Sequence, residues 1–478
     1  MTTLFTGARV HGSPATSLAV AGGLLTWLGH DYPGQATTTV DLAGALVTPA
    51  FVDAHVHATA AGLLRTGLDL TAATSLTDVL DAVRDRVAAA PAEPVWGHGW
   101  DETAWPDNRP PTRAELDAAA GDTPVYLSRV DVHSALASTA LVELAPAART
   151  APGWSPDGPL TRDAHHHVRG AARAGLSAEQ RHAAQRAFLT HAASRGVASV
   201  HECGGPDIAG REDFDELLAL DSPVEVVGYW GERGPCPPGA RGLAGDLFVD
   251  GALGSRTAAL HAPYTDAPHT SGARYLDAEQ IAAHLVACTE AGRQAGFHVI
   301  GDAAVAEVVA GFRRAEKVVG EQALAGSRHR LEHLEMITAE QADELARLGV
   351  VASVQPLFDA AWGGREGMYA QRLGARAAAL NPFATLAAAG LTLAFGSDAP
   401  VTPVDPWATV DAAVHHRTPG SGIDEAAAFA AHTRGGRIAA GQDWTGDLTP
   451  GAPATFAVWR ERRCVRLVRD GTTMFEVS

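Results

Sequence analysis

The segment Ala50-Phe51-Val52-Asp53-Ala54-His55-Val56-His57-Ala58 decides how this chain is interpreted. It is an apolar run that ends in His-x-His, which predicts a buried strand. Side chains two positions apart on a strand share a face, so His55 and His57 reach one place. Neutral imidazole is a common ligand of zinc-type metals. The first hypothesis is a metal centre, and a chance pair in a chain with 21 histidines is the alternative.

Three later runs also end in residues that can bind a metal ion. These runs lie at residues 295–302, 329–333 and 393–400. A site that activates water needs several neutral imidazoles, a carboxylate and an open coordination position. Catalytic residues at the C-terminal ends of separate strands are typical of a (β/α)8 barrel. The sequence therefore predicts one metal site built from His55, His57, His298, His333 and Asp398.

Strand-like runs alternate with Ala-rich stretches that predict helices at 75–89, 178–195, 278–295 and 338–348. Such alternation predicts parallel βα units, and we place a (β/α)8 TIM barrel at residues 49–444. Its strands are predicted near 51–57, 197–202, 223–229, 246–250, 296–300, 329–333, 350–354 and 393–398. The interval of about 58–190 is then an insertion that forms a lid or side wall. Within it, Trp100 and His133 are candidate substrate-binding residues, with simple packing as the alternative.

Short β-type runs separated by glycine turns occupy both ends of the chain. We predict that residues 1–48 and 445–478 form the two halves of one small β-sandwich domain. The apolar run 18–28 is too short to span a membrane, and Gly22-Gly23 in its middle predicts a hairpin turn.

Composition limits the classes of partner. Lys and Arg total 37 against 55 Asp and Glu, and the resulting charge of −18 argues against binding nucleic acid. The four cysteines are Cys203, Cys236, Cys288 and Cys464, and no two of them have a short paired spacing. We therefore expect a cytoplasmic location and no disulfide framework. We expect a small-molecule substrate and no membrane partner, and leave a homo-oligomer open.

Four further motifs, together with these histidines, carry a resemblance to a known family. The motifs lie at residues 96–102, 131–135, 250–258 and 298–303. The chain resembles the amidohydrolase superfamily, and within it the amidohydrolase 3 group, which includes N-substituted formamide deformylases. The resemblance covers nearly the whole chain. It implies a distorted (β/α)8 barrel beside a small β-sandwich, a divalent metal such as zinc, and hydrolysis of a non-peptide C–N bond, without naming a substrate.

One position departs from the family pattern. Relatives often carry a lysine, carboxylated to bridge two metals, where this chain has Asp246. A shorter aspartate could bridge through its two oxygens, and Glu202 at the end of a predicted strand is a second candidate for the lost carboxylate. The sequence leaves open whether one or two ions bind.

The expected roles follow the resemblance. His55 and His57 hold the ion with His298. Asp398 binds the ion or the attacking water, accepts a proton and passes it to the leaving nitrogen. His333 binds a second ion or polarises the substrate oxygen. Arg256 clamps a substrate carboxylate or carbonyl, or else forms a salt bridge within its loop, and Asp302 orients an imidazole.

Two alternatives remain at this stage. A mononuclear aminohydrolase that deaminates a cyclic substrate would also lack the bridging lysine, but it would have a glutamate close after the barrel histidine, where Gly301-Asp302 stands here. A barrel that has lost catalysis would be expected to have lost imidazoles as well as the lysine, and none is missing.

Overall fold

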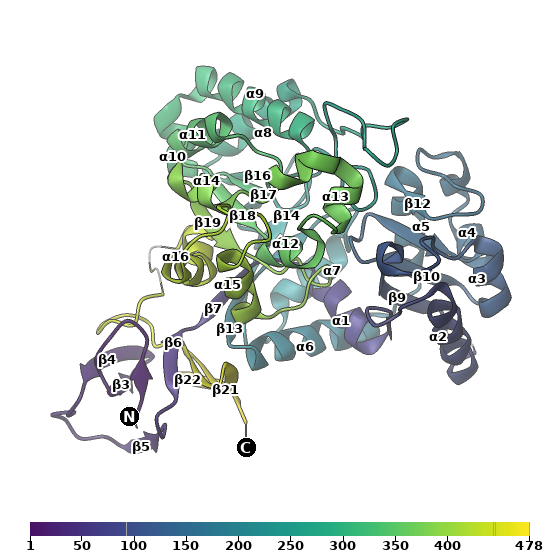
Figure 1. Ribbon diagram of the computed structural model, residues 1–478. Coiled ribbons are helices and arrows are strands. Elements are labelled where there is room, and N and C mark those ends of the chain that lie inside the picture. The colour runs from purple at the N-terminus through teal and green to yellow at the C-terminus, as the bar shows by residue number, and fades with distance from the viewer. Residues whose placement is uncertain (92, 443, 445, 478) are drawn as a thin grey trace.

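Eight parallel strands form the centre of the computed structural model, which describes residues 1–91, 93–442, 444 and 446–477 (Figure 1). In sheet order they are β7 (Phe51–Val56), β13 (Val197–Gly204), β14 (Glu225–Trp230), β15 (Gly242–Leu243), β16 (Gln294–Val299), β17 (Arg330–His333), β18 (Val351–Val354) and β19 (Thr392–Phe395). A parallel bridge between Val56 and Ala399 brings the two edge strands together. The sheet is therefore a nearly closed barrel, and the predicted fold class is confirmed.

The fourth barrel strand differs from its prediction. The strand expected near 246–250 is wrong, because β15 ends at Leu243 and the chain is irregular beyond it. Gly245 has a φ of +78°, a left-handed conformation that interrupts an extended strand. A single bridge from Phe248 to His298 keeps the segment beside β16. Asp246 consequently lies in a bend at the barrel mouth.

Helices cover the outside of the barrel, and the core between strands and helices is apolar. They are α1 (Ala58–Thr66), α6 (Ala178–Ser194), α7 (Arg211–Ala219), α8 (Ala278–Glu290), α9 (Asp302–Val319), α10 (Glu321–Ser327), α11 (Ala339–Arg347), α12 (Pro356–Trp362), α13 (Met368–Leu373), α14 (Phe383–Ala388), α15 (Pro406–Val414), α16 (Glu425–Ala430) and α17 (Gly436–Ala439). Among the described residues, no helix has the length and apolar character needed to cross a bilayer.

The segment after the first barrel strand builds a second sheet at the side of the barrel (Figure 1). Its order is β12 (Leu160–Thr161), β11 (Ser134–Ala137), β10 (Val125–Arg129), β9 (Val95–Trp100) and β8 (Leu68–Asp69). Its helices are α2 (Leu76–Ala89), α3 (Arg113–Ala120), α4 (Thr139–Leu144) and α5 (Arg162–Ala174). The flanking α1 and α6 pack on each other so closely that a Cβ at Gly62 would lie 1.9 Å from the Ala184 oxygen. These two helices share the apolar core of the barrel, so the extra sheet rests on a rigid base.

The chain ends form two facing sheets below the barrel (Figure 1). One contains β4 (Leu24–Gly29), β3 (Ser17–Ala21), β1 (Thr2–Thr6) and β5 (Thr38–Asp41); the other contains β2 (Arg9–Val10), β6 (Leu46–Pro49), β20 (Phe456–Arg460), β21 (Arg463–Arg469) and β22 (Thr472–Glu476). Side chains from both sheets, such as Leu18 and Phe456, share one core. Gly22 and Gly23 both have positive φ and form the β3–β4 turn, as predicted. The predicted boundary at residue 445 lies outside the described residues.

Candidate metal centre

The end of β7 delivers His55 and His57 to the barrel mouth. The strand is held beside the segment that follows β19: the Asp398 N–H donates to the His55 carbonyl and the His57 N–H donates to the Ala399 carbonyl, both at 2.8 Å. Both imidazoles are buried. Because these hydrogen bonds join the first and last barrel strands, the positions of the two histidines depend on barrel closure.

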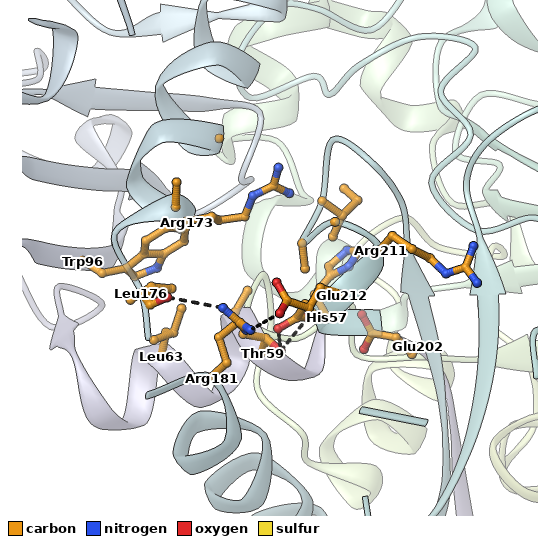
Figure 2. A pocket seen from close by; sticks show the side chains of 17 residues that line it. His57, Thr59, Leu63, Trp96, Arg173, Leu176, Arg181, Glu202, Arg211 and Glu212 are labelled. Atoms are coloured by element: carbon orange, nitrogen blue, oxygen red, sulfur yellow. Dashed lines mark hydrogen bonds and ion pairs between the residues drawn. The ribbon is translucent and has the colours of Figure 1, made fainter. Parts of the chain in front are cut away.

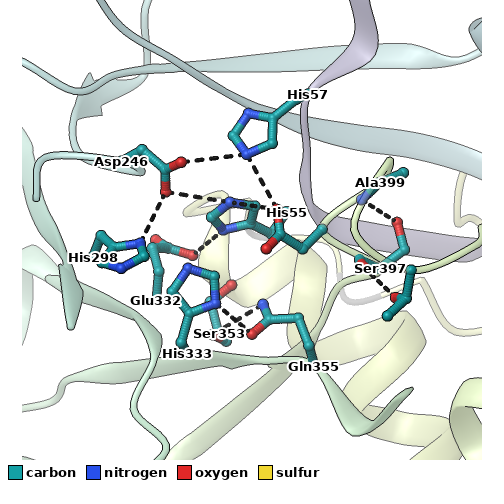
Figure 3. A network of polar contacts seen from close by, with 12 residues as sticks. His55, His57, Asp246, His298, Glu332, His333, Ser353, Gln355, Ser397 and Ala399 are labelled. Atoms are coloured by element: carbon teal, nitrogen blue, oxygen red, sulfur yellow. Dashed lines mark hydrogen bonds and ion pairs between the residues drawn. The ribbon is translucent and has the colours of Figure 1, made fainter. Parts of the chain in front are cut away.

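Asp246 lies at the centre of a cluster of histidines (Figure 3). Its Oδ1 is 3.4 Å from His55 Nε2 and 3.6 Å from His298 Nδ1, and its Oδ2 is 3.3 Å from His57 Nε2. Asp398 Oδ1 lies 3.1 Å from His57 Nε2 and 3.5 Å from His55 Nε2. The short aspartate therefore reaches the histidines.

His333 completes the cluster from the end of β17. Its ring centroid lies 4.5 Å from that of His298 and 5.0 Å from that of His55. Potential ligand atoms fall into overlapping groups whose members lie within 4.8 Å of one another, among them His55–His57–Asp246, Asp246–His298–His333 and His55–His333–Asp398. The structure thus brings together the five residues predicted as ligands and Asp246.

The donor set fits a divalent metal ion. Five buried atoms of the cluster residues make no hydrogen bond to the described chain: His55 Nε2, His57 Nδ1, His298 Nδ1, Asp246 Oδ1 and Asp398 Oδ1. Unsatisfied buried polar atoms are costly, and their convergence indicates a ligand that satisfies them together. Imidazole nitrogens with carboxylate oxygens are the donors typical of zinc sites in hydrolases. Two of the ligand groups, His55–His57–Asp246 and Asp246–His298–His333, share Asp246. The two oxygens of Asp246 face different histidines.

Two side chains orient the imidazoles from behind the cluster. His55 Nδ1 donates to Glu332 Oε2 at 2.9 Å, and His333 Nδ1 donates to Gln355 Oε1 at 2.8 Å. Each bond leaves the Nε2 lone pair of its ring free to face a metal ion. Arg330 in turn donates to Glu332 Oε1 at 2.5 Å and Oε2 at 3.0 Å, which anchors that carboxylate.

The charges of the cluster are strongly coupled. Burial would lower the pKa of His57, but attraction to Asp246 and Asp398 outweighs it and raises this pKa to about 9. Burial and repulsion from His298 lower the pKa of His333 to about 4. Burial opposes ionisation of Asp398, yet His55 and His57 hold its pKa below the ordinary value. In the metal-free protein the cluster therefore carries ionised carboxylates beside protonated His57, and His333 is neutral.

Sequence reasoning missed Glu332, Gln355 and Arg330. The pattern Arg330-Leu331-Glu332 contained a signal, because two charged residues with period two on a buried strand share one face and need each other. Gln355 follows β18 directly and carries no such pattern. Its role depends on where the barrel places it relative to His333.

The other predicted site residues have varied surroundings. The His133 ring lies 5.0 Å from that of His298 between centroids, with the two planes tilted by 50°, and it lines a cavity with His333 and Asp398. Glu202 is buried and accepts a hydrogen bond from the Ala58 N–H at 2.7 Å. It lines a cavity with His57 but belongs to none of the ligand groups found among the described residues.

Trp100, Arg256 and Asp302 are engaged away from the cluster, which corrects their predicted placement. The Trp100 indole is buried in the core of the side sheet and donates to the Leu127 carbonyl at 2.9 Å. Arg256 forms an ion pair of 2.7 Å with Asp266, the loop-bridging alternative. Asp302 accepts from the His261 N–H at 3.0 Å. The amino-acid sequence gives no sign of these partners, which lie at other positions of the chain.

Fold and cluster together define a barrel protein with a buried site of metal-ligand type. Residues 38–473 match the family model described as the amidohydrolase family, and the chain belongs to that family. It is 27% identical over 419 residues to YtcJ of Bacillus subtilis (strain 168), covering 81% of this chain and 76% of that protein. It is 23% identical over 407 residues to N-substituted formamide deformylase of Arthrobacter pascens, covering 73% and 71%.

A solved structure agrees with this assignment. An uncharacterized metal-dependent hydrolase from Pyrococcus horikoshii OT3 superposes with a TM-score of 0.75 at 25% identity, covering 99% of this chain and all of that one (100%). The predicted family resemblance is confirmed, and the chain is a hydrolase of the amidohydrolase superfamily.

Proposed function

We propose that this protein cleaves a non-peptide C–N bond, of amide or formamide type, in a small molecule. The observation that carries the proposal is the buried cluster of imidazoles and carboxylates with unsatisfied atoms facing one point. Similarity to N-substituted formamide deformylase supports this bond type. Zinc fits the donor set, with His55, His57 and His298 joined by Asp246 and Asp398 as the residues that hold it, and His333 completing a second position.

A bound ion would act as a Lewis acid at the barrel mouth and favour ionisation of water near neutral pH. The protein's own contribution begins with orientation. Glu332 and Gln355 hold His55 and His333 in one tautomer, with the free Nε2 atoms toward the centre. Neither ring has to reorganise when the ion binds, so the ligand set is preorganised.

Asp398 is the proposed general base and acid. Its backbone has a φ of +54°, and its N–H donates to the His55 carbonyl, which points the carboxylate across the mouth. Its lowered pKa keeps it ionised and able to accept a proton from attacking water. It can then deliver that proton to the departing nitrogen. His333, neutral because burial lowers its pKa, serves as a ligand or as a partner for the substrate oxygen.

Asp398→Asn tests the assignment. We expect kcat to fall on the order of 10²- to 10⁴-fold on a panel of N-formyl and N-acetyl amines, because the amide cannot take up the proton. Metal content by elemental analysis and the melting temperature show whether the site still forms. Full turnover with metal retained would remove Asp398 from this role. Ammonia released from a cyclic purine or pyrimidine, with no amide cleaved, would favour the deaminase alternative.

A further inference from the structure

Helix α5 carries two arginines, the buried Arg169 and the half-buried Arg173, that form no ion pair with another described residue. Arg169 and Arg173 lie one turn apart. Arg169 is 7% exposed, its Nε makes no hydrogen bond, and no ion pair joins it to another described residue. Arg173 Nη2 donates to the Pro206 carbonyl at 3.1 Å, while its buried Nη1 has no partner in the described chain.

Both guanidinium groups line cavities that share one residue of the metal-type cluster, His57. Arg173 lines a cavity of about 300 Å³ that has His57 and Glu202 on its other side (Figure 2). Arg169 lines a second cavity, again with His57. The two cavities share the lining residues His57, Ala60, Trp96 and Ile208, so they adjoin one another. A ligand that contacts His57 from these cavities lies within the same lining as both arginines.

Other buried arginines of this chain show what a structural role looks like. Arg129 lies within 3.1 Å of carboxylates of Asp101, Glu102 and Asp131. A buried cation without such a partner is costly, and a like charge one turn away increases the cost. Burial and the nearby Arg169 lower the pKa of Arg173 to about 10. An anion placed between the two guanidinium groups would relieve both effects.

We infer that Arg169, assisted by Arg173, binds a carboxylate of the substrate, so that the substrates are small amides or formamides that also carry a carboxylate. This inference rests on the proposed function for the position of the scissile bond. Guanidinium forms paired hydrogen bonds with a carboxylate, and burial strengthens them. The acids Glu202, Glu212 and Asp213 line the larger cavity and would oppose a more highly charged phosphate. A singly charged carboxylate fits this balance best.

A binding experiment that needs no turnover tests the inference. Zinc-loaded protein is titrated with 3-phenylpropionate, with its neutral counterpart 3-phenylpropan-1-ol, and with inorganic phosphate. We expect wild type to bind the carboxylate about 10- to 100-fold more tightly than the alcohol, and Arg169→Met to lose that preference. Arg186→Met, on the exposed face of α6, is the matched control and should bind as wild type does. Tighter binding of phosphate than of the carboxylate, or an unchanged preference in Arg169→Met, would overturn the inference.

Melting temperatures separate ligand binding from a structural role. Without ligand, Arg169→Met should melt no lower than wild type, because it removes an uncompensated buried charge. With 3-phenylpropionate, wild type and Arg186→Met should gain stability, whereas Arg169→Met should not. A large loss of stability in unliganded Arg169→Met would assign the residue to the fold and contradict the inference.

Turnover then distinguishes this inference from the proposed function. N-formylglycine is compared with N-formylmethylamine, which lacks the carboxylate. The expected kcat/KM ratio is about 10 to 100 in wild type and in the control Arg186→Met, and near one in Arg169→Met. Equal cleavage of both compounds by wild type would refute the carboxylate preference and leave the proposed function standing. No cleavage of any amide would refute the proposed function, and the titration with 3-phenylpropionate would still decide whether Arg169 binds a carboxylate.

Discussion

Two buried polar regions meet at His57, and they are built in opposite ways. On the cluster side, Glu332 and Gln355 hold the outer nitrogens of His55 and His333, and the unsatisfied atoms of His55, His298, Asp246 and Asp398 lie toward one another. On the α5 side, the Nε of Arg169 has no hydrogen-bond partner among the described residues. The first region is a preorganised socket for a cation. The second region holds a positive charge that has no counter-ion among the described residues. Together the two regions fit a ligand with a polar bond at one end and a negative charge at the other.

Removing Asp246 should produce the largest effect. Asp246→Ala deletes the one carboxylate shared by two ligand groups, so metal content should fall by at least one ion per chain. Activity should fall by more than ~100-fold, because even the outer partners of metal ligands are worth about 10- to 100-fold. Elemental analysis and steady-state kinetics measure both.

Glu202→Ala is the control for this experiment, since Glu202 is a buried carboxylate in the neighbouring cavity without a place in the ligand groups. Metal content should be unchanged in this variant. Near two ions in wild type, falling only in Asp246→Ala, would indicate a bridging aspartate. Loss of metal in Glu202→Ala instead would transfer the bridging role to Glu202.

Glu332→Gln tests whether metal binding depends on the hydrogen bond that Glu332 accepts from His55. The amide keeps the size of the side chain but loses the charge that holds the His55 Nδ1 proton and pairs with Arg330. We expect zinc affinity to fall about 10- to 100-fold, measured by competition with a chelator. Glu344→Gln, which alters an exposed pair with Arg313, should leave affinity unchanged. Equal affinities in all three proteins would mean that the cluster does not depend on its outer partners.

The smallest expected effect concerns stability against pH on the arginine side. Asp213 lines the cavity with Arg173 and accepts a hydrogen bond from the Thr59 hydroxyl at 2.9 Å. Burial raises its pKa from 3.8 to about 6, because the attraction to Arg181 and Arg173 does not offset the loss of solvation. The raised pKa stabilises the folded protein fully below pH 3.8, and this contribution is lost as the pH rises through about 6.

In Asp213→Asn that pH dependence should disappear. The stability of wild type relative to the variant should therefore fall by about 2 kcal/mol between pH 4 and pH 7, measured by urea unfolding of the metal-free proteins. A difference that instead grows with pH would show that Asp213 is ion-paired in the folded state. That result would give the α5 arginines a partner and remove the contrast between the two regions.

Much of the barrel was predictable because its signals are local. The predicted helix at 178–195 corresponds to α6 (Ala178–Ser194), where Ser177 and Gln180 form a capping box. The run ending in His-x-His is β7, with both histidines at its end. The fourth strand was misplaced because the apolar run around Phe248 has the composition of a strand. The positive φ of Gly245 interrupts the extended backbone before that run.

The site was predictable where a ligand follows a strand and unpredictable where it depends on packing between distant segments. His298, His333 and Asp398 follow recognisable runs and do converge. Trp100 and Arg256 are of residue types that often bind ligands. In the structure, however, the Trp100 indole donates to the Leu127 carbonyl and Arg256 forms an ion pair with Asp266. Arg169 gave no signal, because nothing in a helix sequence shows that an arginine will be buried without a carboxylate beside it.

The sandwich formed by the two chain ends has a consequence for how the molecule is made. Strand β6 pairs with β20, so Val47 meets Val458 across nearly the whole chain. During synthesis β6 leaves the ribosome early, and one of its edges stays unpaired until the barrel and β20 have been translated. Such long-range pairing slows folding, and an exposed strand edge can recruit another chain. Pairing of β20 with β6 is therefore the step that covers this strand edge.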